Sequence, residues 1–252
     1  MIKLSGYGRR EWLGTGVVAF ALVVGCGLIA ALLNSHVGIF LGLLVVFVWC
    51  CLAAFFRDPE RSVPKDPEAI CSPADGVIRD IELIRGEGEE FHEHFKGEDM
   101  VRIGIFLSVF DVHINRAPCE MSVSFRNYKK GCFHDARDGR ASKENESLAL
   151  GGIGRIGDFH FPLVVRQISG AIARRIVCEA QAGTELKRGE RYGMIKFGSR
   201  TELFLPAGTE FELEVKVGDR VSAGSSMLAK LSKEGTPAEF GTDTKTFVEQ
   251  KP

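Results

Sequence analysis

Residues 193–206 read GMIKFGSRTELFLP, and they set a Gly-Ser bond between two short apolar runs. Both runs have the composition of β-strands. An ordinary exposed turn between two strands is more polar than the break at Gly198-Ser199. The sequence therefore predicts that two strands meet at this bond, and the rest of the chain is best interpreted around it.

Gly198 and Ser199 are residue types that allow a chain to cleave the peptide bond between them by itself. Gly198 lacks a β-carbon and tolerates the strained backbone that lets the Ser199 hydroxyl attack the Gly198 carbonyl. The amide would become an ester, elimination at the Ser199 α-carbon would break the ester, and hydrolysis of the dehydroalanine would leave a pyruvoyl group. A plain hairpin turn is the competing interpretation, because Gly224-Ser225 is a second such pair in a turn-like run.

Four motifs occur in order along the chain, and together they resemble the short, prokaryotic form of phosphatidylserine decarboxylase, a pyruvoyl-dependent proenzyme. The motifs are FFRDPER at 55–61, SPADGV at 72–77, DVHINRAP at 111–118 and the stretch at 193–206. The resemblance implies a lyase of phospholipid biosynthesis that converts phosphatidylserine to phosphatidylethanolamine and CO2. It also implies two self-cleaved chains, 1–198 and 199–252, that stay together as a heterodimer.

The resemblance assigns roles to Asp75 and His113 beside Ser199 and Gly198. It places Asp75 in the self-cleavage machinery, and His113 in the decarboxylation step as a proton donor or orienting group. From the residues alone, Asp75 is equally an aspartate that stabilises its own turn, and His113 is more often structural. The long form of the family has a second histidine where this chain has Arg116, which stays protonated and cannot be a base. The base for Ser199 is therefore left open between His113 and Asp75.

The implied pyruvoyl group at Ser199 would form a Schiff base with the substrate amine and accept the electrons that loss of CO2 leaves behind. No metal or further cofactor is then required. The region 166–200 contains eight basic and three acidic residues, which predicts a basic surface for a lipid phosphate or, equally, solvated strand faces. Arg116, Lys196 and Arg200 are the candidate substrate-binding residues. Nucleic-acid binding is not expected, because aromatic residues are not interleaved with these charges.

Two nearly uncharged apolar runs, at 12–33 and 37–56, are each about long enough to span a bilayer. They predict a two-helix transmembrane hairpin, with a signal peptide and a hairpin buried in a soluble core as the competing interpretations. Basic residues lie before and after the hairpin, whereas the turn between the helices carries only His36, so both ends are expected in the cytoplasm. The catalytic domain would then lie on the cytoplasmic face of the cell membrane.

Beyond the hairpin, the chain has the patterns of a mainly β protein. We expect a hairpin and linker at 1–65, a catalytic domain at 66–232 and a polar, disordered tail at 233–252. Strands are predicted at 101–107, 122–128, 160–168, 171–178 and 211–217, and a glycine-rich loop or lid at 131–157. Turn-like segments at 187–193 and 217–224 resemble those of lipoyl-type barrels. The predicted fold is therefore a β-sandwich or barrel with lipoyl-like hybrid-barrel character.

Composition and cysteine spacing exclude other classes. The net charge of −1 indicates no particular partner, and seven cysteines without a C-x-x-C pair argue against a zinc ribbon or a disulfide framework. A membrane-anchored zinc peptidase would need a ligand pair such as His92 and His94, but these lie in a charged, loop-like stretch. The other alternative is a non-enzymatic membrane adaptor. Neither predicts a broken Gly198-Ser199 bond.

Overall fold

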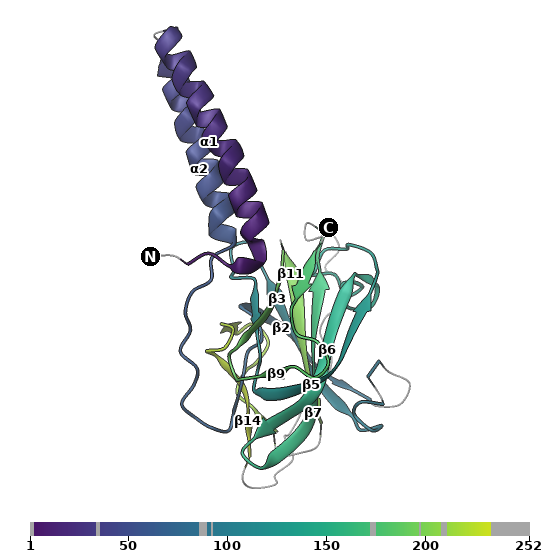
Figure 1. The fold of residues 1–252 in the computed structure, drawn as a ribbon. Helices are drawn as coiled ribbons and strands as arrows, with labels where there is room; N and C mark the ends of the chain where they lie inside the picture. Colours follow the sequence, from purple (N-terminus) through teal and green to yellow (C-terminus); the bar gives the residue numbers. More distant parts are fainter. Residues whose placement is uncertain are drawn as a thin grey trace.

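A helical hairpin stands on one end of a β-domain (Figure 1). The computed structural model describes residues 3–33, 36–85, 90–91, 93–171, 175–196, 198–207 and 211–232. A short 3-10 turn, Gly6–Gly8, leads into α1 (Arg9–Leu32), and α2 (His36–Phe55) returns to the domain. The tail predicted at 233–252 lies outside the described residues.

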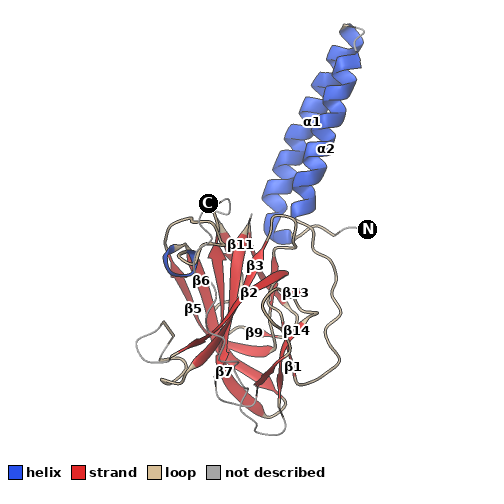
Figure 2. Ribbon diagram, turned by 180° about the vertical axis from the view of Figure 1, so that it is seen from behind, coloured by secondary structure: helices blue, strands red, loops and turns tan. Residues whose placement is uncertain are grey.

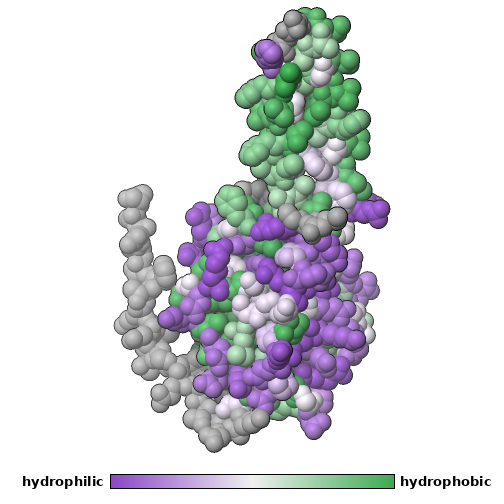
Figure 3. Space-filling view, turned by 90° about the vertical axis from the view of Figure 1, so that its left-hand side faces the viewer, coloured by the Kyte–Doolittle hydropathy of each residue, from purple (hydrophilic) through white to green (hydrophobic). Residues whose placement is uncertain are grey.

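The hairpin exposes apolar side chains along its length, as the green surface in Figure 3 shows. Phe20 is 73% exposed, Leu32 82% and Phe40 66%. Both helices are long and apolar enough to cross a membrane. The predicted two-helix hairpin is confirmed, and the alternative of a hairpin buried in a soluble core is wrong, because the β-domain covers only its base.

In the described residues, the β-domain consists of one eight-stranded sheet and two three-stranded sheets (Figure 2). The large sheet has the order β13-β2-β3-β11-β7-β6-β5-β9, and the small sheets have the orders β4-β10-β8 and β1-β14-β12. The strands of the large sheet are β2 (Gly76–Ile84), β3 (Met100–Leu107), β5 (Glu120–Lys129), β6 (Ser147–Ile156), β7 (Phe159–Ser169), β9 (Glu185–Leu186), β11 (Ser199–Pro206) and β13 (Arg220–Val221). The small sheets contain β1 (Ala69–Cys71), β4 (Ile114–Arg116), β8 (Ile176–Cys178), β10 (Arg191–Ile195), β12 (Phe211–Leu213) and β14 (Met227–Leu231).

Strand β11 lies in the middle of the large sheet, antiparallel to β3 and to β7. Side chains alternate between the faces of a strand, so Thr201, Leu203 and Leu205 share one face with Ser199. Leu203 and Leu205 pack into the main core, whereas Arg200 and Glu202 point to the opposite face. Every residue of β11 is buried. The Gly198-Ser199 bond therefore lies at the start of a fully buried central strand.

The opposite face of β11 carries a buried ionic cluster. Arg200 donates to Asp80 at 2.6 and 2.7 Å and to Glu202 at 2.7 Å, and Arg166 donates to Glu202 at 2.5 Å. Burial opposes the ionisation of Glu202, but Arg166, Arg200 and Arg102 outweigh it and lower its pKa to about 2. Gly104 leaves the room that Arg200 needs, since a Cβ there would lie 2.0 Å from the guanidinium.

The mainly β prediction is confirmed, but several predicted boundaries are wrong. Residues 147–156 form strand β6 instead of belonging to a loop, and only 141–144 in the first part of that stretch are helical (α3, Ala141–Glu144). Gly151 and Gly152 occupy β6 because a Cβ at either would approach the Phe125 ring or the Ser122 carbonyl within 2.2 Å. Of the described residues in the predicted strand at 171–178, only 176–178 form a strand, β8, and the predicted strand at 211–217 shrinks to β12. Lipoyl-like character stays a prediction.

Candidate active site

The Gly198-Ser199 bond lies where β10 turns into β11. Gly198 has a φ of +61°, a conformation that residues with a β-carbon rarely adopt. Ser199 pairs with Leu107 of β3 and Ser169 of β7 and has no solvent exposure. Its Oγ is buried without a hydrogen-bond partner among the described residues. A buried hydroxyl without a partner is costly, which marks this serine as a candidate reactive group.

Gly170 approaches the carbonyl of the candidate bond from β7. A Cβ on Gly170 would lie 2.3 Å from the Gly198 oxygen and 3.1 Å from its carbonyl carbon. Only glycine leaves this space open, so Gly170 is part of the site. No signal in the single sequence pointed to it, because the close approach joins two strands that are far apart in the chain.

His113 lies at the same end of the sheets as Ser199. Its carbonyl oxygen accepts from the Ile195 N–H at 3.2 Å, and Ile195 precedes the turn into β11. Its side chain is fully buried against the Phe55 ring at the base of the hairpin. The Asp111 carbonyl, 3.0 Å from Nδ1, can only accept, so Nδ1 carries the proton and Nε2 keeps its lone pair. Nε2 is buried without a partner in the described structure.

Burial lowers the pKa of His113 to about 4, although the Asp111 carbonyl and the Asp111 charge favour the protonated form. The imidazole is therefore neutral at neutral pH. A neutral imidazole with a free Nε2 can accept a proton, which is the property that a base for a serine hydroxyl requires.

A buried amide links the strands that carry His113 and Ser199. Asn115 donates to Thr201 Oγ1 at 3.1 Å and to the Pro73 carbonyl at 3.3 Å, and Gln167 donates to Asn115 Oδ1 at 2.8 Å. His113 immediately precedes β4, and Ser199 is the first residue of β11. The contact thus ties together the two segments that carry His113 and Ser199. Asn115 lies inside a quoted motif, but its role required the structure.

Asp75 is buried beside β13 and is already engaged. Its Oδ2 accepts from Arg61 at 2.5 Å and its Oδ1 from the Ala223 N–H at 2.7 Å. Burial raises the pKa of this carboxyl, while the Ala223 hydrogen bond and Arg61 oppose the shift. Within the described residues no hydrogen bond joins Asp75 to His113 or Ser199. Its predicted part in self-cleavage stays a prediction.

The three candidate substrate-binding residues lie in different places. Arg116 is buried and holds the linker, with Nη2 3.3 Å from Asp58 and Nη1 3.0 Å from the Gly189 carbonyl. Arg200 belongs to the ionic cluster on the face of β11 opposite Ser199. Lys196 lies on the side of β10 that faces the hairpin and contacts Glu11 of α1. The charges of all three are paired within the protein, and their contact with substrate stays a prediction.

The predicted metal-ligand pair of a zinc peptidase finds no structural support. His92 lies outside the described residues. His94 Nε2 is 3.0 Å from the Gly152 carbonyl oxygen, which is within hydrogen-bonding distance. The described part of the chain contains no group of three or more histidine, cysteine or carboxylate side chains that could hold a metal.

A family model described as phosphatidylserine decarboxylase matches residues 50–229, most of the chain. The chain belongs to the phosphatidylserine decarboxylase family. It is 42% identical over 217 residues to a phosphatidylserine decarboxylase proenzyme of Geobacter metallireducens, covering 84% of this chain and 94% of that protein. It is 37% identical over 201 residues to the proenzyme of Neisseria meningitidis serogroup C, covering 79% and 70%. Membership of the family confirms the resemblance seen in the four motifs.

We predict that Gly170→Ala strongly slows cleavage of the Gly198-Ser199 bond. The added Cβ would press on the carbonyl that the serine must attack and would displace it from reach of the hydroxyl. The measurement is the ratio of full-length to cleaved chain over time, after cell-free synthesis into lipid nanodiscs.

The matched control is Gly139→Ala, because a Cβ there meets nothing within 4 Å and its φ is not positive. Equal cleavage rates in wild type and Gly170→Ala would show that the close approach at Gly170 is irrelevant to the reaction. A slow rate in both variants would point to a general folding defect.

Proposed function

We propose that this chain is a self-processing phosphatidylserine decarboxylase that forms phosphatidylethanolamine and CO2 with a pyruvoyl group made from Ser199. The observation that carries the proposal is a pair of buried atoms, Ser199 Oγ and His113 Nε2, that have no hydrogen-bond partner among the described residues. Ser199 begins β11 and His113 immediately precedes β4, and the Asn115–Thr201 hydrogen bond joins these two strands. Membership of the family supports the activity, and the relatives are named as proenzymes.

In the first step, His113 accepts the proton of Ser199 Oγ, and the oxygen attacks the Gly198 carbonyl carbon. The bond from that carbon to the Ser199 nitrogen then breaks, and His113 returns the proton to the nitrogen. The left-handed backbone at Gly198 and the gap at Gly170 leave that carbonyl accessible. The ester that forms is broken by removal of the Ser199 α-proton, which releases the Gly198 carboxylate. Water then converts the dehydroalanine to a pyruvoyl group with loss of ammonia. The products are chains 1–198 and 199–252, the second of 54 residues (252 − 198).

The space around Ser199 suits a small carbonyl group at the first residue of β11. The pyruvoyl group supplies an electron sink for the carbanion that forms when CO2 leaves an amino acid. Asp111 and Phe55 hold the His113 ring. After taking up a proton from water, this ring delivers it to the substrate carbon. Asp75, tied to Arg61, holds the turn that precedes β2 and supports this arrangement as a positioning residue.

A pocket beside Gly198 provides a route for the lipid headgroup. The pocket has a volume of about 300 Å³ and is lined in part by Val109, Ala136, Arg137 and Ala171. The next residue after Val109, Phe110, is 84% exposed, and its carbonyl accepts from Arg57 at the base of the hairpin. An exposed aromatic beside the hairpin suits the interfacial zone of a bilayer. We propose that the substrate enters here from the membrane surface.

The hairpin places this entrance at the membrane. Two adjacent apolar helices account for membrane association, and their flanking basic residues favour a cytoplasmic position for both ends. The domain would then work on the inner leaflet of the cell membrane, where its substrate has its headgroup at the surface. The hairpin thereby removes the need for the domain to find a lipid from solution.

We predict that the rate of self-cleavage is constant from about pH 8 to about pH 5 and falls with a midpoint near pH 4, where buried His113 gains a proton. The measurement is a pulse of synthesis at neutral pH followed by transfer of the nanodiscs to each pH. His160→Gln is the control, since His160 is exposed and should not affect the profile.

Stability must be followed in parallel with this profile. The pKa of His113 in the folded state lies below that of an unfolded histidine, so the unfolded chain binds more protons between about pH 6.5 and pH 4 and stability falls as the pH is lowered. Circular dichroism at each pH distinguishes unfolding of the protein from protonation of His113 in the folded protein. A cleavage midpoint near pH 6.5 in a folded protein would contradict the lowered pKa of His113.

The proposed activity is tested by incubating the purified full chain with phosphatidylserine in mixed micelles and measuring CO2 and phosphatidylethanolamine. We expect both products from the wild type and neither from Ser199→Ala. Ser225→Ala, at the second Gly-Ser pair, should retain full activity. Product formation by Ser199→Ala would contradict the assignment of the reactive group to Ser199.

A further inference from the structure

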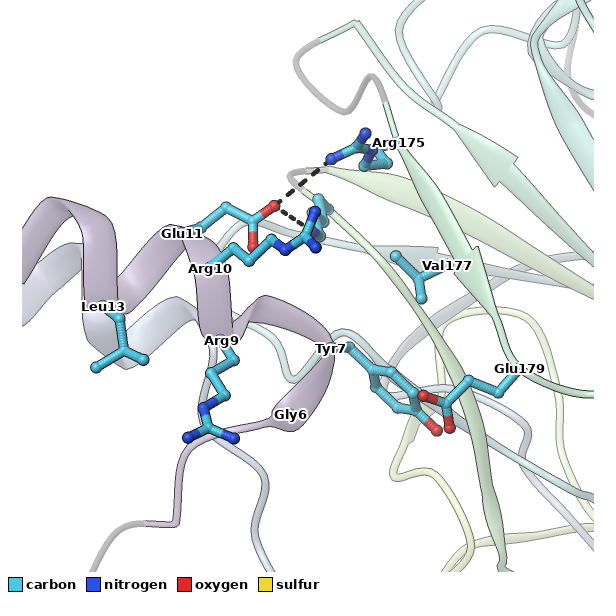
Figure 4. A pocket seen from close by; sticks show the side chains of 10 residues that line it. Gly6, Tyr7, Arg9, Arg10, Glu11, Leu13, Arg175, Val177 and Glu179 are labelled. Carbon is cyan, nitrogen blue, oxygen red and sulfur yellow. Dashed lines mark hydrogen bonds and ion pairs between the residues drawn. The ribbon is translucent and has the colours of Figure 1, made fainter.

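A second pocket, of about 670 Å³, lies between the base of α1 and strand β8 (Figure 4). Its lining includes Tyr7, Arg10, Glu11, Arg175, Glu179 and Lys196. Figure 4 shows Arg10 extending from the helix toward β8 and Tyr7 lying beside the Glu179 carboxylate. The residues come from the start of the hairpin and from the outer side of the β4-β10-β8 sheet, so the pocket is built jointly by the hairpin and the domain.

The pocket carries unpaired positive charge. Lys196 contacts Glu11. Arg175 lies 3.9 Å from the same carboxylate, and the Arg175 side chain is 72% exposed. Arg9 and Arg10 are exposed and form no ion pair with another described residue. Among the described residues of the lining, the basic side chains of Arg9, Arg10, Arg175 and Lys196 outnumber the carboxylates of Glu11 and Glu179, and Glu11 is shared between two cations. Arginine guanidinium groups bind phosphate oxygens through paired hydrogen bonds, so the surplus charge suits a phosphodiester.

The pocket is separate from the proposed active site. Val177, which lines it, lies opposite Met194 in the sheet, and Met194 packs toward Phe55 and Phe56 of the hairpin. Asn115, in the same sheet, reaches the other side to bond Thr201. The sheet therefore stands between this pocket and Ser199, so one phosphate group in the pocket cannot belong to a lipid whose headgroup is at Ser199.

The position along the hairpin identifies the kind of ligand. The basic residues immediately precede the apolar part of α1, which begins near Leu13, another lining residue. If the hairpin spans the bilayer, as the proposed function requires, the pocket lies at the depth of lipid headgroups with its apolar edge toward the acyl chains. A soluble anion would gain nothing from that edge.

We propose that this pocket binds the phosphodiester group of an anionic membrane phospholipid that is not the molecule undergoing decarboxylation. The lipid would join Arg10 of the hairpin to Arg175 of the domain, beside the Glu11–Lys196 contact. Lys196 lies two residues before Gly198, so a lipid bound here holds the hairpin against the strand that leads into the reactive bond.

The test uses the full-length Ser199→Ala chain, which keeps the measurement independent of cleavage and decarboxylation. Phosphatidylglycerol is the probe, because it is anionic and has no amino acid to decarboxylate. Its brominated form quenches the two tryptophans, Trp12 and Trp49, both in the hairpin. Titration in mixed micelles against brominated phosphatidylcholine gives the relative binding constant of the anionic lipid.

We expect phosphatidylglycerol to bind several-fold more tightly than phosphatidylcholine, and Arg10→Gln with Arg175→Gln to lower this preference by about fivefold for each charge removed. Arg155→Gln, at the far end of β6, is the matched control and should keep the preference. The same two substitutions in a chain that keeps Ser199 should still allow self-cleavage, which would show that the double variant folds.

Equal binding of both lipids by the starting protein, or an unchanged preference in the double variant, would overturn the proposal. Displacement of the lipid by millimolar inorganic phosphate would also overturn it, by showing a site for free phosphate. The preference for the anionic lipid is measured under conditions in which no lipid is decarboxylated. Failure of the decarboxylase proposal would therefore appear in the product assay and leave this result standing.

Discussion

The hydrogen bond from Asn115 to Thr201 joins the two parts of the protein that the proposed chemistry needs. It links the small β4-β10-β8 sheet to the large sheet, and Gln167 holds the same amide from a third strand. All three side chains have no solvent exposure, so the loss of any one leaves a buried group unpaired at a cost of about 1 to 3 kcal/mol. The contact ties β4, which His113 precedes, to β11, which begins at Ser199.

Strand β11 separates two environments, and the separation explains its sequence. On one face, Ser199 is buried beside Thr201, which accepts from Asn115. On the other, Glu202 stays ionised among Arg166 and Arg200, which compensates for the cost of burying charge. The charges are kept away from the serine, where a neutral base is needed. The ionic cluster is therefore a structural device of the central strand.

Much of this arrangement could be predicted from the sequence, because local patterns dictate it. Two long apolar runs predict the hairpin, and the Gly-Ser bond between strand-like runs indicates the reactive position. The close approach of Gly170 to Gly198 and the pairing of Arg200 with Asp80 could not be predicted, since each joins distant strands. The stretch at 147–156 has the glycine content of a loop but forms β6, because its glycines serve strand packing. The residues alone leave the base for Ser199 open between His113 and Asp75, and its assignment to His113 is part of the proposed function.

The central claim is that Ser199 becomes the reactive carbonyl, and the intact mass of the purified protein under denaturing conditions tests it most directly. The account predicts two chains, 1–198 and a chain of 54 residues (252 − 198). The smaller chain should resist Edman degradation and be lighter at its first residue by the difference between serine and pyruvoyl. A single full-length chain in folded wild-type protein, or a second chain that begins with an intact serine, would contradict the account.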